Sequence, residues 1–299
     1  MSHVHAHASA DPRRTPDPAI PVPPVAWPTV ALFAAAVTLA AVSTTLALRG
    51  TIPAAAGVAL NTVASFLFFT VLHESVHRTA GTGEPLNVWL GRISALGVTP
   101  IAAAPVFRFI HMQHHMHTNE DDGSDPDHWT NVGPAWSTPL RWATVDLAYV
   151  PFYLRRVGRR PRREQIECAV TVLLLAVAGV VLTVNGHLVD VLVYYVLPTR
   201  LAIWFLGYAF DWLPHHGLED LTADRYRATR NRIGWERLLT PLLLYQNYHL
   251  VHHLHPRIPF YRYIAAWRRN EDAYLAHDPA LATPLGRELS VQEYRRLRS

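Results

Sequence analysis

The chain has 299 residues, of which half are hydrophobic and only 17% are charged, a composition too apolar for an ordinary soluble enzyme. Its single cysteine, Cys168, excludes internal disulfides and cysteine-ligated iron–sulfur clusters, whereas 18 histidines are an unusual supply of metal ligands. All 27 basic residues are Arg and the net charge is +4. Because these arginines cluster beside apolar runs, we expect a lipid bilayer as the partner and no nucleic acid.

The N-terminal segment, residues 1–24, is rich in proline and polar side chains and has too little apolar surface to fold. We predict a disordered tail there and one membrane domain over residues 25–299. The tail histidines His3, His5 and His7 could bind a metal weakly, but a chance cluster in a polar tract is the preferred interpretation.

Two uncharged runs follow, residues 29–48 and 52–72, with Gly50 and Pro53 at the turn between them. About 20 residues rising ~1.5 Å each cross a hydrocarbon core of roughly 30 Å. The sequence therefore predicts a transmembrane hairpin that ends on His73.

A third apolar stretch, residues 93–107, is interrupted by Pro100 and Pro105 and is too short to span, so we expect a re-entrant or interfacial segment. Residues 168–184 and 191–210 form a second predicted hairpin. Pro198 and Arg200 lie in its second arm, where we expect a kink and a buried charge. Arg200 is expected either to pair with a carboxylate or to face a substrate tunnel.

Two hairpins place residues 73–166 and 211–299 on the same side as the N-terminus. An arginine run between residues 155 and 163 lies in that compartment, and the positive-inside rule then assigns it to the cytoplasm. The predicted fold class is all-α: about four transmembrane helices in two hairpins, interfacial helices and a cytoplasmic histidine-rich cap.

Three histidine clusters carry the chemistry. The first is His73-Glu74-Ser75-Val76-His77, and two more place histidines at offsets 0, 3 and 4. On a helix these offsets share one face, so the imidazoles can converge on one metal or on two neighbouring metals. The two triplets are His111, His114 and His115, and His249, His252 and His253.

Eight such histidines exceed the three protein ligands of a usual catalytic zinc site and would suit two irons. A rival interpretation remains, because His73 to His77 also satisfies the H-E-x-x-H pattern of zinc proteases, with Glu74 as general base. That reading leaves the other two clusters unexplained. A histidine-rich metal transporter is a further alternative, although transporters place their sites near the middle of the membrane.

The order H-x3-H, H-x2-HH, H-x2-HH between apolar hairpins resembles the membrane fatty acid desaturase superfamily. Longer segments, FRFIHMQHHMHTN, SDPDHW, AFDWLPHH and YQNYHLVHHLHPRIPFYRY, resemble bacterial and cyanobacterial beta-carotene hydroxylases over residues 70–265. The resemblance implies a di-iron site whose ligands are the eight clustered histidines. It also implies a ninth, for which His215 is the best candidate and His216 the competitor.

Carboxylates and other polar groups commonly orient ligating imidazoles. The sequence candidates for this role are Glu74, His117, Asp125, Asp127, His128, Asp211 and Asn247, although residues 120–127 could equally be a solvated loop.

The implied reaction is O2-dependent hydroxylation of a lipophilic substrate, by resemblance the beta-ionone ring of a carotenoid. An acyl-lipid desaturase using the same two irons is the alternative, and ketolation after hydroxylation stays open. Because the sequence has no redox-cofactor motif of its own, we expect an external electron donor of the ferredoxin type. The expected location is the inner cell membrane, with the histidines on the cytoplasmic side.

Overall fold

The computed structural model describes residues 15–101 and 103–298, so His3, His5 and His7 lie outside the described residues. It confirms the all-α membrane class, with four helices that are long and apolar enough to cross a bilayer. The α-helices are α1 (Trp27–Leu48), α2 (Ala54–Val76), α3 (Glu84–Val98), α4 (Ala104–His117), α5 (Thr138–Trp142), α6 (Val145–Leu154), α7 (Arg162–Val184), α8 (Leu188–Val191), α9 (Leu197–Leu206), α10 (Leu213–His215), α11 (Glu236–Leu242), α12 (His249–Leu254), α13 (Tyr263–Arg269), α14 (Glu271–Leu275) and α15 (Val291–Arg298).

The first hairpin pairs α1 with α2 along their length. A polar contact inside the membrane joins them, because Ser43 Oγ donates to Asn61 Oδ1 at 2.5 Å and Asn61 Nδ2 donates to Thr44 at 2.9 Å. Without these partners the buried amide would carry the full cost of desolvation. α2 continues past the predicted span and carries His73 on its last turn.

The third apolar stretch does not span the membrane, as predicted. It divides into the end of α3 and the beginning of α4, and residues 99–101 and 103 belong to neither helix. Pro105 lies in the first turn of α4, where its missing N–H has no helical partner to lose.

The second hairpin consists of α7 and a continuous 28-residue helical run, Leu188–His215, longer than the predicted arm. Two π-helical segments interrupt this run, Leu192–Val196 and Gly207–Trp212. The first immediately precedes Pro198 and re-spaces the backbone hydrogen bonds where proline cannot donate one. Asn61 Nδ2 also donates to the Tyr194 carbonyl at 2.9 Å, which ties this segment to α2.

Arg200 pairs with a carboxylate, one of the two expected outcomes. Its Nη1 and Nη2 donate to the two oxygens of Asp146 at 2.9 and 2.5 Å, and Thr99 Oγ1 adds a third donor at 3.1 Å. This fork of hydrogen bonds joins α9 to the short helix α6.

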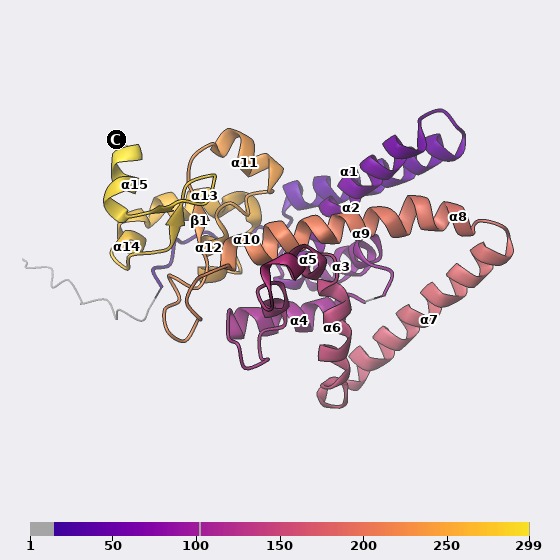
Figure 1. Cartoon of the computed structure of the whole chain (residues 1–299), viewed down its shortest axis with the longest axis horizontal. Helices are drawn as coiled ribbons and strands as arrows, with labels where there is room; N and C mark the ends of the chain where they lie inside the picture. Colours follow the sequence, from indigo (N-terminus) through magenta and orange to yellow (C-terminus); the bar gives the residue numbers. More distant parts are fainter. Residues whose placement is uncertain (1–14, 102, 299) are drawn as a thin grey trace, which may run out of the picture.

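α7 packs only loosely on the rest of the molecule, and Figure 1 shows it diverging from α9. Cys168 is its one buried residue. Thr171, Leu175 and Gly179 are half-buried at a spacing of four residues, so one face of α7 turns towards the other helices.

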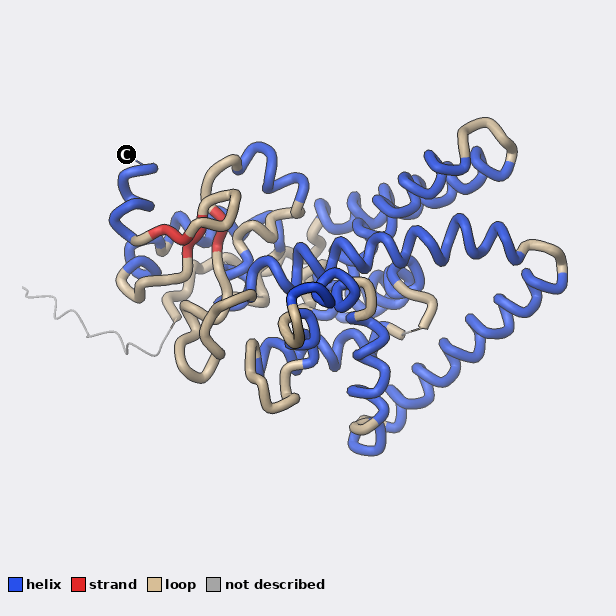
Figure 2. The backbone as a smooth tube through the Cα atoms, in the orientation of Figure 1, coloured by secondary structure: helices blue, strands red, loops and turns tan. Residues whose placement is uncertain are grey.

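The turns of both hairpins lie at one end of the molecule, and the C-terminal segments lie at the other (Figure 1). Those segments hold a small sheet, the red strands of Figure 2, in which β2 (Leu281–Ala282) pairs parallel with β1 (Asn231–Arg232) and antiparallel with β3 (Glu288–Leu289). Beside the sheet, Tyr248, Tyr263 and Trp267 belong to the largest buried core.

Part of the segment assigned to the tail has a defined place. Residues 15–24 form neither helix nor strand, and Arg269 Nη1 donates to the carbonyls of Pro18 and Ala19 at 3.0 Å. Asn270 Nδ2 holds the Pro16 carbonyl at 3.0 Å, and Ile20 packs against the C-terminal core. Residues 15–24 thus extend the cap.

Candidate metal centre

The three histidine clusters meet at the end of the molecule opposite the hairpin turns. The first occupies the last turn of α2 and the residue after it, the second the last two turns of α4, and the third all of α12. Helical spacing explains the convergence within each cluster, and packing of α2, α4 and α12 brings the clusters together.

Five imidazoles form a first group through their Nε2 atoms. His77 and His111 are 2.7 Å apart, His111 and His115 are 3.1 Å apart, and His115 and His252 are 2.9 Å apart. His252 is in turn 3.1 Å from His73.

Four imidazoles form a second group beside the first. His249 Nε2 lies 3.1 Å from His215 Nε2 and 3.2 Å from His253 Nε2, and His114 joins them within 4.8 Å. The structure thus brings His215 to the site. Its competitor His216 is exposed and stacks on Trp212 instead.

These spacings fit metal ions better than they fit hydrogen bonds. A neutral ring nitrogen offers one donor or one acceptor, so a chain of five Nε2 atoms at contact distance cannot satisfy itself. Metal–nitrogen bonds of about 2.1 Å place neighbouring ligand nitrogens roughly 3.0–3.4 Å apart. The Nε2 contacts of both groups, 2.7–3.2 Å, lie in or just below that range. The two buried clusters are therefore compatible with a di-iron site.

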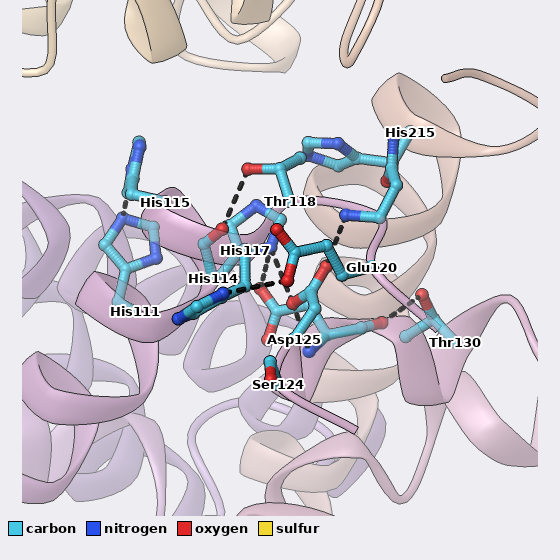
Figure 3. A network of polar contacts seen from close by, with 12 residues as sticks. His111, His114, His115, His117, Thr118, Glu120, Ser124, Asp125, Thr130 and His215 are labelled. Atoms are coloured by element: carbon cyan, nitrogen blue, oxygen red, sulfur yellow. Dashed lines mark hydrogen bonds and ion pairs between the residues drawn. The ribbon is translucent and has the colours of Figure 1, made fainter. Parts of the chain in front are cut away.

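Protein groups orient the rings of the second group through Nδ1. Asp125 Oδ1 accepts from His114 at 3.0 Å, as Figure 3 shows, and Gln246 Oε1 accepts from His249 at 2.7 Å. The Ala228 carbonyl lies 3.3 Å from His215 Nδ1, and Thr118 Oγ1 lies 3.4 Å from His253 Nδ1. Each Nδ1 partner fixes the tautomer that leaves Nε2 facing the group.

Burial decides the protonation of most of these imidazoles. It lowers the pKa of His77, His111, His115 and the three α12 histidines well below the ordinary value, which leaves them neutral and ready to ligate. Burial acts on His114 in the same direction. There the charges of Asp125 and Asp127 outweigh it and raise the pKa to about 9.

Glu74 does not sit where a general base would. Its Oε2 accepts from Thr79 Oγ1 at 2.7 Å and from the Phe260 amide at 3.1 Å, and its Oε1 lies 3.5 Å from His73 Nδ1. The carboxylate is buried and joins the end of α2 to the segment after α12. This placement supports an orienting role beside His73 and removes the zinc-protease reading of this cluster.

The other sequence candidates differ in their distance from the imidazoles. Asp127 is 3.4 Å from His114 Nδ1 and accepts from Tyr149 at 2.6 Å. His117 instead contacts Glu120 at 2.9 Å on the outer side of α4 (Figure 3). Asn247 donates to Thr240 at 3.3 Å rather than to a histidine.

Two further candidates contact no cluster histidine through a hydrogen bond among residues 15–101 and 103–298. His128 has a buried Nδ1 without a partner. Asp211 faces the cavity described below, together with Asp127.

Sequence reasoning missed three orienting residues: Gln246, Thr118 and Tyr263, whose hydroxyl lies 2.9 Å from His252 Nδ1. Gln246 precedes His249 by three residues, a spacing that could have been noticed. Nothing in the sequence places Tyr263 beside His252, because the turn at Pro256 and Pro259 brings it back.

An apolar cavity of about 460 Å³ leads from the membrane helices to the histidines. Its walls come from α2, α3, α4, α6, α7 and α9, with side chains such as Leu72, Val106 and Leu206. Its polar end is formed by His73, His111, His114 and His249, together with Asp127, Tyr149 and Asp211. Both histidine groups therefore face one largely apolar space.

Comparison with known proteins identifies the family. The family model for fatty acid desaturases matches residues 49–284, most of the chain and all three histidine clusters. The chain belongs to the fatty acid desaturase family.

Two curated relatives of this desaturase-family protein are beta-carotene ketolases from Paracoccus species. One, from strain N81106, is 29% identical over 199 residues, which cover 65% of this chain and 71% of the relative. The other, from strain PC1, is 27% identical over 195 residues with the same coverage. Family and relatives together make the chain a multi-pass membrane oxidoreductase, an oxygenase of the carotenoid-modifying or desaturase-like kind.

Proposed function

We propose that the protein oxygenates an end ring of a carotenoid, with O2 as co-substrate and two irons as cofactors. The observation that carries the proposal is the apolar cavity that ends on both histidine groups. It offers a lipophilic chain a dry path from the membrane to the metals. The names of the Paracoccus relatives favour a carotenoid over an acyl chain.

One iron would be held by the first group and the other by the second. His115, His252 and His253 have nitrogens within 4.8 Å of one another and lie where the two groups adjoin. The irons would supply O2 activation and oxidation of an unactivated C–H bond. Nine imidazole nitrogens suit two irons and exceed what a single zinc would use.

The chain itself would position the ring and keep water out. Phe69, Phe107 and Phe210 line the cavity beside the histidines and leave little polar surface for water to solvate. Asp127, Tyr149 and Asp211 are the polar groups on the wall nearest the metals.

Hydroxylation and ketone formation share their first step. O2, two electrons and two protons convert one ring C–H into C–OH and release one water. A second oxygenation of the same carbon gives a geminal diol, which loses water to leave the ketone. The hydroxylation expected from the sequence is thus the first half of the reaction named for the relatives, and we propose that this protein completes both halves.

The electrons would come from an external donor of the ferredoxin type. Around the turn from α6 to α7, Arg155, Arg159, Arg162 and Arg163 are exposed, whereas Arg160 pairs with Glu164 at 2.8 Å. These exposed charges lie where α7 enters the membrane and favour the cytoplasmic face of the inner membrane for the histidine cap. They suit anionic lipid as well as an acidic protein.

The test is expression in a bacterium that accumulates beta-carotene, followed by pigment analysis. Keto or hydroxy derivatives, absent when a His252→Ala variant is expressed, are the expected result. Unchanged carotene together with newly unsaturated acyl chains would instead assign the same site to lipid desaturation.

A further inference from the structure

A second cavity, of about 490 Å³, lies near the turn of the second hairpin, away from the histidines. Leu182, His187 and Asp190 at that turn form part of its wall, and Asn61, Ser65 and Thr199 line it from α2 and α9. Its lining thus includes several polar side chains besides the apolar ones. The functional site does not account for it.

Three helices lead from one cavity to the other. On the helical run Leu188–His215, Thr199 lines the second cavity, while Ile203, Leu206 and Phe210 line the first. These positions are three or four residues apart and share one helical face. On α2, Phe68 lines the second cavity and Leu72, one turn later, lines the first.

The third helix is α7, which lines the first cavity from Gln165 to Val172 and the second at Leu182. The distance from Gln165 to Leu182 along the axis is about 25 Å at ~1.5 Å per residue. Between these two positions, few α7 side chains point towards the other helices. At Gly179, an added Cβ would contact nothing within 4 Å. Two cavities separated by about this distance would suit the two ends of one elongated molecule about as long as the hydrocarbon core is thick, roughly 30 Å.

Ser65 indicates which chemical group an elongated ligand would place in the second cavity. It is only 2% exposed, and its Oγ has no hydrogen-bond partner among the described residues. A buried hydroxyl without a partner is unfavourable relative to one in water, so a native structure usually supplies a partner. Here the hydroxyl belongs to a residue that lines the second cavity.

We propose that the second cavity is the subsite for the distal ring of an elongated carotenoid, and that Ser65 hydrogen-bonds an oxygen on that ring. The protein then selects a substrate whose far end is already hydroxylated over the plain hydrocarbon. This inference rests on the proposed function, since it names the substrate of the same site. In a reaction sequence, a ring hydroxylase would supply the preferred substrate.

The experiment compares two carotenoids that share one unmodified ring and differ only in a hydroxyl on the opposite ring. Iron-loaded protein in nanodiscs is assayed for binding of each carotenoid and for oxygenation of the shared ring. Ser65→Ala should weaken binding and kcat/KM for the hydroxylated carotenoid roughly 2- to 12-fold, the range of one net hydrogen bond. Values for the hydrocarbon should not fall, because its distal ring has no oxygen for Ser65 to bind.

Thr70→Val is the matched control, because Thr70 is also buried on α2 with an unpartnered hydroxyl but lies outside both cavities. It should not alter the preference between the two carotenoids. A second variant, Ala40→Phe, adds bulk to the wall of the second cavity. It should impair both full-length carotenoids and spare a truncated one-ring analogue that does not reach it.

Equal effects of Ser65→Ala on both carotenoids, or no effect on either, would overturn the subsite. An Ala40→Phe variant that loses the short analogue as severely as the long ones would also count against it. Selective binding without any oxygenated product would leave the subsite standing and remove the proposed function instead.

Discussion

The two histidine groups are held in different ways. In the second group, all four Nδ1 atoms have a partner: Asp125, Gln246, the Ala228 carbonyl and Thr118. In the first, His252 contacts Tyr263 and His73 lies near Glu74. His111 is placed by packing, since it stacks on Phe107 at 5.3 Å. Helix packing therefore orients much of the first group, and hydrogen bonds from loops orient the second.

This difference implies that the groups respond differently to mutation. A ring fixed by helical packing keeps its direction when a neighbouring polar group is removed. A ring fixed by one hydrogen bond from a loop can rotate.

The largest effect is expected when a ligand is removed from either group. His252→Ala and His249→Ala should each abolish turnover, as should His115→Ala, because each deletes a nitrogen that no neighbour can replace. Membrane insertion should be intact, since none of these rings lies within a spanning segment. Product analysis and membrane fractionation provide the two measurements, and full activity in any of the three would refute that residue's role as a ligand.

An intermediate effect is expected for the groups that hold Nδ1. Asp125→Asn should lower metal affinity about 10- to 100-fold, the usual cost of losing an orienting carboxylate. Tyr263→Phe, in the first group, should cost less, because His252 stays on α12 among the packed rings. Iron retention during dialysis against a graded chelator series would rank the two variants. Equal losses would contradict the contrast between packing and hydrogen bonding.

The smallest effects are expected outside both groups. His117→Ala removes only the contact with Glu120 on the outer side of α4, so activity and iron content should stay within about twofold of wild type. Replacing His3, His5 and His7 together should be equally mild. A large loss of iron in either variant would mean that the site extends further than the two groups.

The sequence predicts the parts of this architecture that depend on local periodicity. Four apolar runs gave the four spanning helices, and the spacing within each cluster predicted rings on one helical face. Asp125 was one of the carboxylates expected to orient an imidazole, and the structure places it beside His114.

Long-range packing was beyond such reasoning. The packing of the helices places His115 beside His252. The same packing brings His215, and not His216, into contact with His249. The chain reverses direction after α12, and this reversal brings Tyr263 into contact with His252. The π-helical segment before Pro198 lets the helical run continue past the proline. These features depend on contacts between residues far apart in sequence, which periodicity does not encode.

Nine imidazoles, from the three clusters and α10, would hold two iron ions. Metal analysis of protein purified from iron-supplemented cells tests it most directly. We predict about two irons per chain in wild type and a loss of iron in both His249→Ala and His252→Ala. A single zinc per chain, retained in both variants, would contradict the account.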